Sequence, residues 1–125
     1  MEEAIFKNEF VTILTEKSHI PWLKIFTTQP YKELSDCPQE LKAKLYACME
    51  IVEWAMRSYY NPTKINIAMF GNYVPHLHIH VMARFENDGF FPESMWGKKQ
   101  REPNLSLPDE GEFLEKLVKE LSEKL

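Results

Sequence analysis

Residues 71–84 read Gly71-Asn72-Tyr73-Val74-Pro75-His76-Leu77-His78-Ile79-His80-Val81-Met82-Ala83-Arg84, with three histidines at every second position. This alternation of polar and apolar residues has the period of a half-buried β-strand, whose successive side chains point to opposite faces. The pattern therefore predicts that the three imidazoles share one face of a strand. Leu77, Ile79 and Val81 share the other face, which can pack into a core.

The three histidines are candidates for function because the chain holds only four in all. Any one of them alone would be an ordinary half-buried side chain. Near pH 7, a neutral imidazole can act as a nucleophile, a proton carrier or a metal ligand. In one interpretation, a histidine attacks phosphorus while its neighbours handle charge and protons. In the other, two or three histidines bind zinc or another divalent metal, and spacing alone does not separate the two.

The same residues resemble the signature of the histidine-triad (HIT) family of nucleotide hydrolases and transferases, His-φ-His-φ-His-φ-φ with φ apolar. Val81 and Met82 fill the last two apolar positions, and Gly71-Asn72 and Arg84 match residues that flank the signature. The resemblance extends from about Trp22 to Trp96. It is closest to compact bacterial members described as diadenosine polyphosphate hydrolases, and it implies an α+β, HIT-like fold that is commonly a homodimer.

The resemblance also implies a mechanism. His78 would attack the α-phosphorus of a nucleoside 5′-phosphate conjugate, such as a dinucleoside polyphosphate or a phosphoramidate. A nucleotidyl-histidine intermediate would form, and water would release the nucleoside monophosphate. His80 would donate to a non-bridging oxygen, and His76 would orient its neighbours and relay protons. No cofactor would be required, although magnesium bound to a polyphosphate leaving group would assist.

Two asparagines are candidates for substrate binding. By resemblance, Asn72 would hold the scissile oxygen, although its side chain is one methylene shorter than the glutamine of many relatives. Asn66 alternates with Ile65 and Ile67, so it lies on the opposite face of its strand from them. If that face carries the histidines, the resemblance gives Asn66 a substrate contact. Otherwise it is a half-exposed asparagine of a sheet, and the sequence leaves the two interpretations equal.

Two other functions stay open at this point. One is a metal-dependent hydrolase in which His76, His78 and His80 hold a zinc ion that activates water. No HExxH or other ligand motif accompanies the histidines, which counts against it. The other is a non-catalytic nucleotide-binding protein. The complete triad counts against that function, because binding alone needs no nucleophile.

Length and composition indicate one domain over residues 1–125, and 44% of the residues are hydrophobic, as in a soluble globular protein. The net charge of −4 argues against a general nucleic-acid or anionic-membrane surface, but not against a nucleotide substrate. No apolar run approaches the ~20 residues that span a bilayer. The first residues lack a signal-peptide pattern, and Cys37 and Cys48 match no metal or redox motif. We therefore expect a cytoplasmic protein with two unpaired thiols.

The remaining elements follow from periodicity. We expect strands over residues 5–15, 22–27 and 64–70, a long helix from Ser35 or Asp36 up to Asn61-Pro62, and a last helix from Asp109 or Glu110 to Leu125. Gly71-Asn72 predicts a tight hairpin turn into the histidine strand. The order predicts an α+β fold: an antiparallel sheet with a long central helix and a C-terminal helix.

The segment Phe90–Trp96 is apolar without helical or alternating spacing. Loops with large aromatic residues often cover a site or a partner surface. We expect this loop to pack over the histidine end of the sheet or across a dimer interface. The fourth histidine, His19, is expected in an exposed turn.

Overall fold

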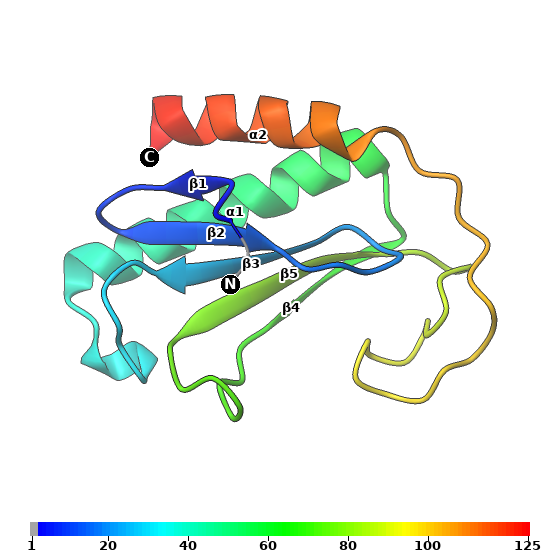
Figure 1. Ribbon diagram of the computed structural model, residues 1–125, viewed down its shortest axis with the longest axis horizontal. Helices are drawn as coiled ribbons and strands as arrows, with labels where there is room; N and C mark the ends of the chain where they lie inside the picture. The colour runs from blue at the N-terminus through cyan, green and yellow to red at the C-terminus, as the bar shows by residue number, and fades with distance from the viewer. Residues whose placement is uncertain (1–2) are drawn as a thin grey trace.

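The computed structural model describes residues 3–125, in which two helices lie on one side of a five-stranded sheet (Figure 1). The strands are β1 (Phe6–Lys7), β2 (Val11–Thr15), β3 (Trp22–Thr27), β4 (Lys64–Ala68) and β5 (His78–Arg84). The helices are α1 (Gln39–Tyr60) and α2 (Glu110–Lys124), and a short 3-10 turn, η1 (Leu34–Asp36), precedes α1. The strand order is β1-β2-β3-β5-β4, with every neighbouring pair antiparallel. This confirms the expected α+β architecture.

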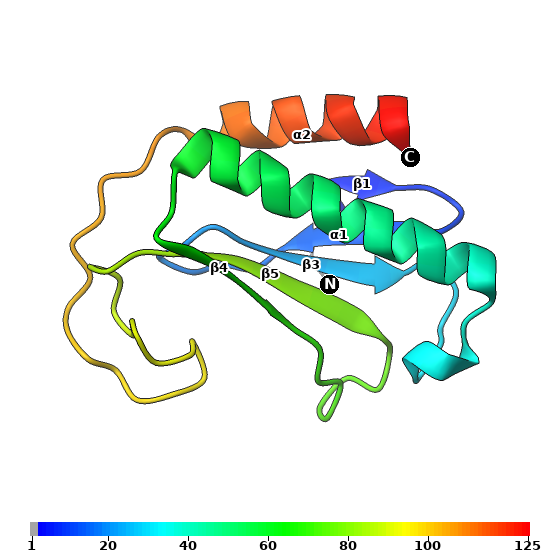
Figure 2. The same ribbon diagram turned by 180° about the vertical axis from the view of Figure 1, so that it is seen from behind.

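One hydrophobic core fills the space between the sheet and the helices. α1 crosses the sheet, and α2 lies beside α1 on the same side (Figure 2). Ile25, Ile79 and Val81 point into this core and are at most 4% exposed, as the alternation predicts. The helices contribute residues at helical spacing: Leu41, Leu45, Cys48, Val52 and Met56 from α1, and Phe113, Leu117 and Leu121 from α2. Because the core occupies one face of the sheet, the histidines lie on the other.

The start of α1 differs from the expected position. Leu34–Asp36 form the separate turn η1, in which the Glu33 N–H donates to an Asp36 carboxylate oxygen at 3.3 Å. Cys37 is extended, with φ −77° and ψ 141°, as proline requires of the residue before it. The α-helix therefore begins only after Pro38. It ends as predicted, with Asn61 left-handed at φ 48°.

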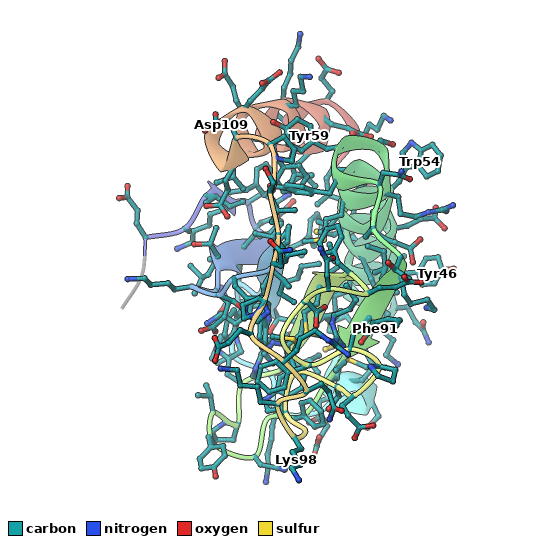
Figure 3. The ribbon with its side chains drawn as sticks, turned by 90° about the vertical axis from the view of Figure 1, so that its right-hand side faces the viewer. Tyr46, Trp54, Tyr59, Phe91, Lys98 and Asp109 are labelled. Carbon is teal, nitrogen blue, oxygen red and sulfur yellow. The ribbon has the colours of Figure 1, made fainter. Side chains whose placement is uncertain are left out.

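α2 begins as predicted, because the side chain of Asp109 accepts a hydrogen bond from the Glu112 N–H. The Tyr59 hydroxyl donates to the Asp109 carbonyl oxygen at 2.6 Å and so ties the end of α1 to the start of α2. Figure 3 shows this junction, with Tyr46 and Trp54 projecting outward from α1. Within residues 3–125, no helix combines the length and the apolarity that a bilayer crossing requires. Both cysteines are buried and unbridged.

Two strand predictions were wrong in detail. Residues 5–15 form the hairpin β1–β2 instead of one strand, because the Asn8 side chain accepts hydrogen bonds from the N–H groups of Phe10 and Val11 and closes a turn. The connection from β4 to β5 runs from residue 69 to residue 77 and is no tight turn. The Leu77 N–H donates to the Tyr31 carbonyl oxygen instead of to β4, so β5 begins only at His78.

Candidate active site

β5 lies between β3 and β4, with its even-numbered residues on the face away from the helices. Residues directly opposite one another in antiparallel strands share a face. His78 is opposite Phe26, and His80 is opposite Lys24. Asn66 is opposite Met82, so it too lies on the histidine face, as one of the two interpretations requires.

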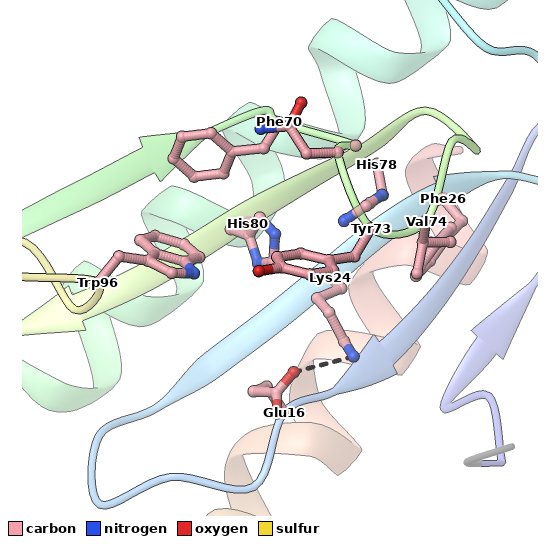
Figure 4. A pocket seen from close by; sticks show the side chains of 11 residues that line it. Glu16, Lys24, Phe26, Phe70, Tyr73, Val74, His78, His80 and Trp96 are labelled. Carbon is pink, nitrogen blue, oxygen red and sulfur yellow. Dashed lines mark ion pairs between the residues drawn. The ribbon is translucent and has the colours of Figure 1, made fainter.

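A pocket of about 440 Å³ opens on this face (Figure 4). Its lining comes from four places: His78 and His80 of β5, Lys24 and Phe26 of β3, Glu16 after β2, and Phe70, Gly71, Asn72, Tyr73, Val74 and Trp96 from loops. Glu16 and Lys24 form an ion pair of 2.9 Å on one wall. His78, His80 and Asn72 are therefore brought together, whereas the lining includes neither His76 nor Asn66.

The ring of His78 is fixed through its Nδ1 atom. That nitrogen lies 2.7 Å from the carbonyl oxygen of His76, and the ring stacks on Phe26 at a centroid distance of 4.6 Å. A carbonyl oxygen can only accept, so Nδ1 carries the hydrogen. In the neutral ring, Nε2 then holds a lone pair, which is the form that a nucleophile needs.

The ring of His80 is fixed in the opposite sense. Its Nδ1 accepts a hydrogen bond of 3.0 Å from the indole Nε1–H of Trp22, so in the neutral ring the hydrogen is on Nε2. Burial lowers the pKa of His80 to about 4, and the neighbouring His78 and Lys24 add to this effect. At neutral pH His80 is therefore an uncharged donor. It lies beside His78, with their ring centroids 4.9 Å apart.

The prediction that all three imidazoles lie on one strand was wrong for His76, which precedes β5 and makes contacts through both its ring and its backbone. Its Nε2 is 2.7 Å from the Thr27 carbonyl oxygen and 3.2 Å from the Thr27 hydroxyl, and its ring packs edge-on against Phe26. The imidazole thereby ties the start of β5 to the end of β3. Its carbonyl oxygen is the group that reaches His78.

A buried ion pair anchors the loop that follows β5. Arg84 donates two hydrogen bonds to Asp88, at 2.9 and 3.2 Å, and both side chains are at most 1% exposed. Arg84 also donates to the Asn66 Oδ1 atom and to the Glu93 carbonyl oxygen, each at 2.8 Å. The Asn66 amide oxygen is thus occupied by Arg84.

Asp88 completes this anchor by accepting hydrogen bonds from the N–H groups of Phe85, Phe90 and Phe91. Burial opposes the ionisation of Asp88. The hydrogen bonds from Arg84 and from the three N–H groups outweigh burial and hold the pKa of Asp88 well below its ordinary value. We call residues 85–101, which this network holds, the site loop.

The site loop covers the histidine face, as expected for the Phe90–Trp96 segment. The Trp96 ring packs edge-on against His80 at 5.0 Å, Trp22 at 5.3 Å and Phe70 at 4.8 Å. All seven residues of β5 are buried, so the expectation of a half-buried strand was wrong. Trp96 of the site loop packs on His80, and Phe26 of β3 stacks on His78.

The prediction of an exposed turn for His19 was also wrong. His19 is half-buried, its Nε2 accepts a hydrogen bond of 3.0 Å from the Gly89 N–H, and its ring stacks on Phe90. His19 thus holds the site loop at Gly89 and Phe90, in addition to the contacts from Arg84 and Asp88.

Comparison with known proteins decides the family. A family model described as the HIT domain matches residues 2–87. The chain belongs to the HIT family. A search of curated proteins finds no match to this chain. The family match begins well before Trp22, where the expected resemblance started, and ends before most of the site loop and α2.

Solved structures of HIT proteins share the fold. A histidine triad protein from Bradyrhizobium japonicum is 28% identical with a TM-score of 0.75, covering 98% of this chain and 89% of that one. One from Marinobacter aquaeolei VT8 is 23% identical with a TM-score of 0.78, covering 95% of this chain and 90% of the other. The diadenosine triphosphate hydrolase of Plasmodium falciparum is 19% identical with a TM-score of 0.60, covering 98% of this chain and 78% of the other.

Several contacts of this HIT site cannot be predicted from local sequence patterns. Trp22 was assigned to a strand, but its hydrogen bond to His80 spans 58 positions, which no local pattern reveals. Lys24 offered a signal, because period-two spacing places this charge on the same face as Trp22 and Phe26. The pairing of Arg84 with Asp88 had a weaker signal, two opposite charges beside apolar residues.

The ring nitrogens bear on the metal interpretation of the triad. The Nε2 atom of His76 is directed at Thr27, and the Nδ1 atoms of His78 and His80 bond a carbonyl oxygen and an indole, so these three nitrogens already have other partners. Within residues 3–125, no group of three His, Cys, Asp or Glu side chains is arranged to hold a metal ion.

Proposed function

We propose that this HIT protein is a nucleotide hydrolase that cleaves at the α-phosphate of a nucleoside 5′-phosphate conjugate. The substrate is a dinucleoside polyphosphate or a phosphoramidate, and the product is the nucleoside monophosphate. One observation carries the proposal: the bond between His78 Nδ1 and the His76 carbonyl oxygen leaves the His78 Nε2 lone pair for attack. His78 lines the pocket, where a phosphoryl group can approach it.

The first step forms a bond from His78 Nε2 to phosphorus and breaks the bond from phosphorus to the leaving group. The nucleotidyl-imidazole is cationic, and its Nδ1–H keeps donating to the His76 carbonyl oxygen, which stabilises that charge. The Nε2–H of His80 donates to a non-bridging oxygen, where negative charge gathers. Water then attacks phosphorus, the bond from phosphorus to His78 Nε2 breaks, and the water gives up a proton to solvent. The nucleoside monophosphate leaves, and His78 keeps its hydrogen on Nδ1 as in the resting form.

The asparagines have unequal support. Asn72 lines the pocket, so we propose that it holds the scissile oxygen. The Asn66 oxygen already accepts from Arg84, so we propose that its amide nitrogen makes the substrate contact. For His76, the contacts support the orienting role, and a proton relay would require its ring to leave Thr27.

The pocket chemistry suits a nucleotide. Phe26, Phe70 and Trp96 offer ring faces against which a base can stack, and such stacking occurs in many nucleotide sites. The fold is shared with a diadenosine triphosphate hydrolase, although that likeness concerns fold alone. We propose that the histidines need no cofactor, and that magnesium matters only when the leaving group is a polyphosphate.

We also infer a cytoplasmic homodimer. Within the part of the chain that the structure describes, β4 is an edge strand of the sheet, and its Ile67 is 41% exposed. A free edge with an exposed apolar residue is open to pairing with a second copy. Sedimentation equilibrium tests the dimer, and a monomer mass at high protein concentration contradicts it.

A hydrolysis assay tests the function. Wild type and His78→Ala are given diadenosine polyphosphates and an adenosine phosphoramidate, each with and without EDTA. We expect wild type to release nucleoside monophosphate, and His78→Ala to lose about 10³-fold or more of the activity. Hydrolysis of the phosphoramidate survives EDTA, because no metal takes part in its chemistry.

The same assay separates the alternatives. Activity on the phosphoramidate that EDTA abolishes and zinc restores would promote the metal-dependent hydrolase. Tight nucleotide binding by wild type and His78→Ala alike, without hydrolysis of any substrate, would leave a nucleotide-binding protein.

A further inference from the structure

The hydrogen bond between Trp22 and His80 links the middle of the sheet to the proposed chemistry. Trp22 begins β3 and lies opposite Met82, next to His80 on the same face. Its Nε1 atom is 3.0 Å from His80 Nδ1. An indole N–H donates and never accepts, and it does not titrate near neutral pH.

The direction of this bond determines which His80 nitrogen bears the hydrogen. A neutral imidazole has two tautomers, and in water both are populated. If His80 carried its hydrogen on Nδ1, that N–H would face the indole N–H, and two donors would meet without an acceptor. Only the tautomer with hydrogen on Nε2 accepts the Trp22 bond.

We infer that Trp22 is a positioning residue that holds His80 in the Nε2–H tautomer, as a fixed donor for the phosphoryl oxygen. The catalytic consequence rests on the proposed function, whereas the tautomer does not. A donor that could also accept would let the imidazole switch tautomers. Because indole cannot, His80 is kept from acting as a base or as a second nucleophile beside His78.

The surroundings keep both rings in place. Trp96 packs edge-on against Trp22 at 5.3 Å and against His80 at 5.0 Å. The site loop therefore contacts both partners of the Trp22–His80 hydrogen bond. The Phe70 ring lies 6.2 Å from His80 on another side. The titratable groups that face His80 are His78, Lys24 and Glu16, the last two joined in an ion pair. His80 is only 8% exposed, so little water competes for its Nδ1 atom.

Imidazole ¹⁵N NMR of the resting protein tests the tautomer directly. In wild type, we expect His80 Nε2 to give the shift of a protonated nitrogen and Nδ1 that of an unprotonated acceptor. Trp22→Phe removes the donor and keeps an aromatic ring, so its His80 signals should move toward the average of two tautomers. Trp54→Phe is the matched control, because Trp54 projects from α1 to solvent and is 56% exposed.

Kinetics measure the consequence for catalysis. We expect kcat of Trp22→Phe to fall about tenfold or more, with a smaller change in KM, because the phosphoryl oxygen loses a pre-oriented donor. Trp54→Phe should keep wild-type kcat and KM. A merely structural role for Trp22 would lower stability without moving the ¹⁵N shifts of His80.

A same-shape analogue guards against misfolding of Trp22→Phe. Replacing Trp22 with 3-benzothienylalanine exchanges the N–H for sulfur and keeps the two fused rings. A wild-type His80 that carries its hydrogen on Nδ1 would overturn the inference. So would an analogue protein with unchanged His80 shifts and unchanged kcat. A wild type with the Nε2–H tautomer and no hydrolysis of any substrate would support the tautomer and overturn its catalytic role, which separates this inference from the proposed function.

Discussion

His76 and His78 are two positions apart, yet they offer different groups to the site. The ring of His76 binds Thr27, while its carbonyl oxygen binds the ring of His78. A glutamine can replace the first contact, because its amide donates to a carbonyl oxygen as an imidazole N–H does. We expect His76→Gln to keep kcat within about tenfold of wild type and His76→Ala to lose more. Only glutamine keeps a side-chain N–H that can donate to the Thr27 carbonyl oxygen.

Steady-state kinetics of both variants check this expectation, with thermal unfolding to compare their stability. If His76→Gln were as inactive as His78→Ala, the result would contradict a purely orienting role and would support His76 as a proton relay.

The low pKa of His80 makes stability depend on pH. The folded state protonates His80 only near pH 4, whereas the unfolded chain does so near the ordinary value of 6.5. Between these values the unfolded state binds more protons, so the free energy of unfolding falls as pH drops from 6.5 to 4 and levels off below. The contribution of His80 is at most about 3 kcal/mol.

Urea unfolding at several pH values measures this dependence. His80→Gln serves as the reference, because other groups titrate in both proteins. The wild type should lose more stability than the variant between pH 7 and pH 4. Parallel curves would show that His80 titrates alike in the folded and unfolded states.

At the residue scale, the sequence predicted correctly that His78 and His80 share a face of a strand, but it placed His76 on that strand too and did not show what each ring bonds. The alternation in β5 places His78 and His80 on one face, and this alternation can be read from neighbouring residues in the sequence. The tautomers depend on partners such as Trp22, 58 positions from His80. The same holds for His19, whose partner Gly89 is 70 positions away.

At the scale of elements, the site loop depends on the ion pair of Arg84 and Asp88. Asp88→Asn keeps the size of the side chain but leaves the buried Arg84 guanidinium without a counter-charge. Removing one partner of a buried pair costs about 3–5 kcal/mol. We expect that loss in the free energy of unfolding, together with faster hydrogen exchange at the N–H groups of Phe90 and Phe91.

Glu112→Gln is the control, because it breaks the exposed ion pair with Lys116 on α2. Exposed pairs contribute at most about 1 kcal/mol. Equal losses in the two variants, measured by urea unfolding, would mean that the buried pair contributes no more than an ordinary surface pair.

Element boundaries followed the sequence where a cap marked them. Asp109 and Asn61 bound their helices as predicted. The long β4–β5 connection was missed because Gly71-Asn72 has the composition of a tight turn, while the bond from Leu77 to Tyr31 that delays β5 comes from a distant segment.

At the scale of the whole molecule, the sheet lies between the hydrophobic core and the proposed catalytic pocket. The core lies on its helical face and the pocket on the other. Leu117 of α2 is 1% exposed within that core. We expect Leu117→Ala to lower the free energy of unfolding by about 2–5 kcal/mol. Its kcat should stay within about twofold of wild type at a temperature where it remains folded, since the histidine contacts are untouched.

Unfolding curves and kinetics on one protein preparation check this separation. A large fall in kcat without unfolding would show that the helical layer controls the geometry of the pocket. The arrangement of layers was predictable, because strand alternation and helical spacing each mark one apolar face. The cover over the second face was harder to predict, because the site loop has no periodicity.

The most direct test of the account is to trap the intermediate on His78. Wild-type protein is mixed with less than one equivalent of a diadenosine polyphosphate or an adenosine phosphoramidate, and then denatured within milliseconds at neutral to alkaline pH, where a phosphorus–nitrogen bond survives. Intact-mass measurement and peptide mapping should find one nucleoside monophosphate on His78, and none in His78→Ala. Product formation in the first turnover with no adduct at any quench time, or an adduct on another residue, would contradict the mechanism.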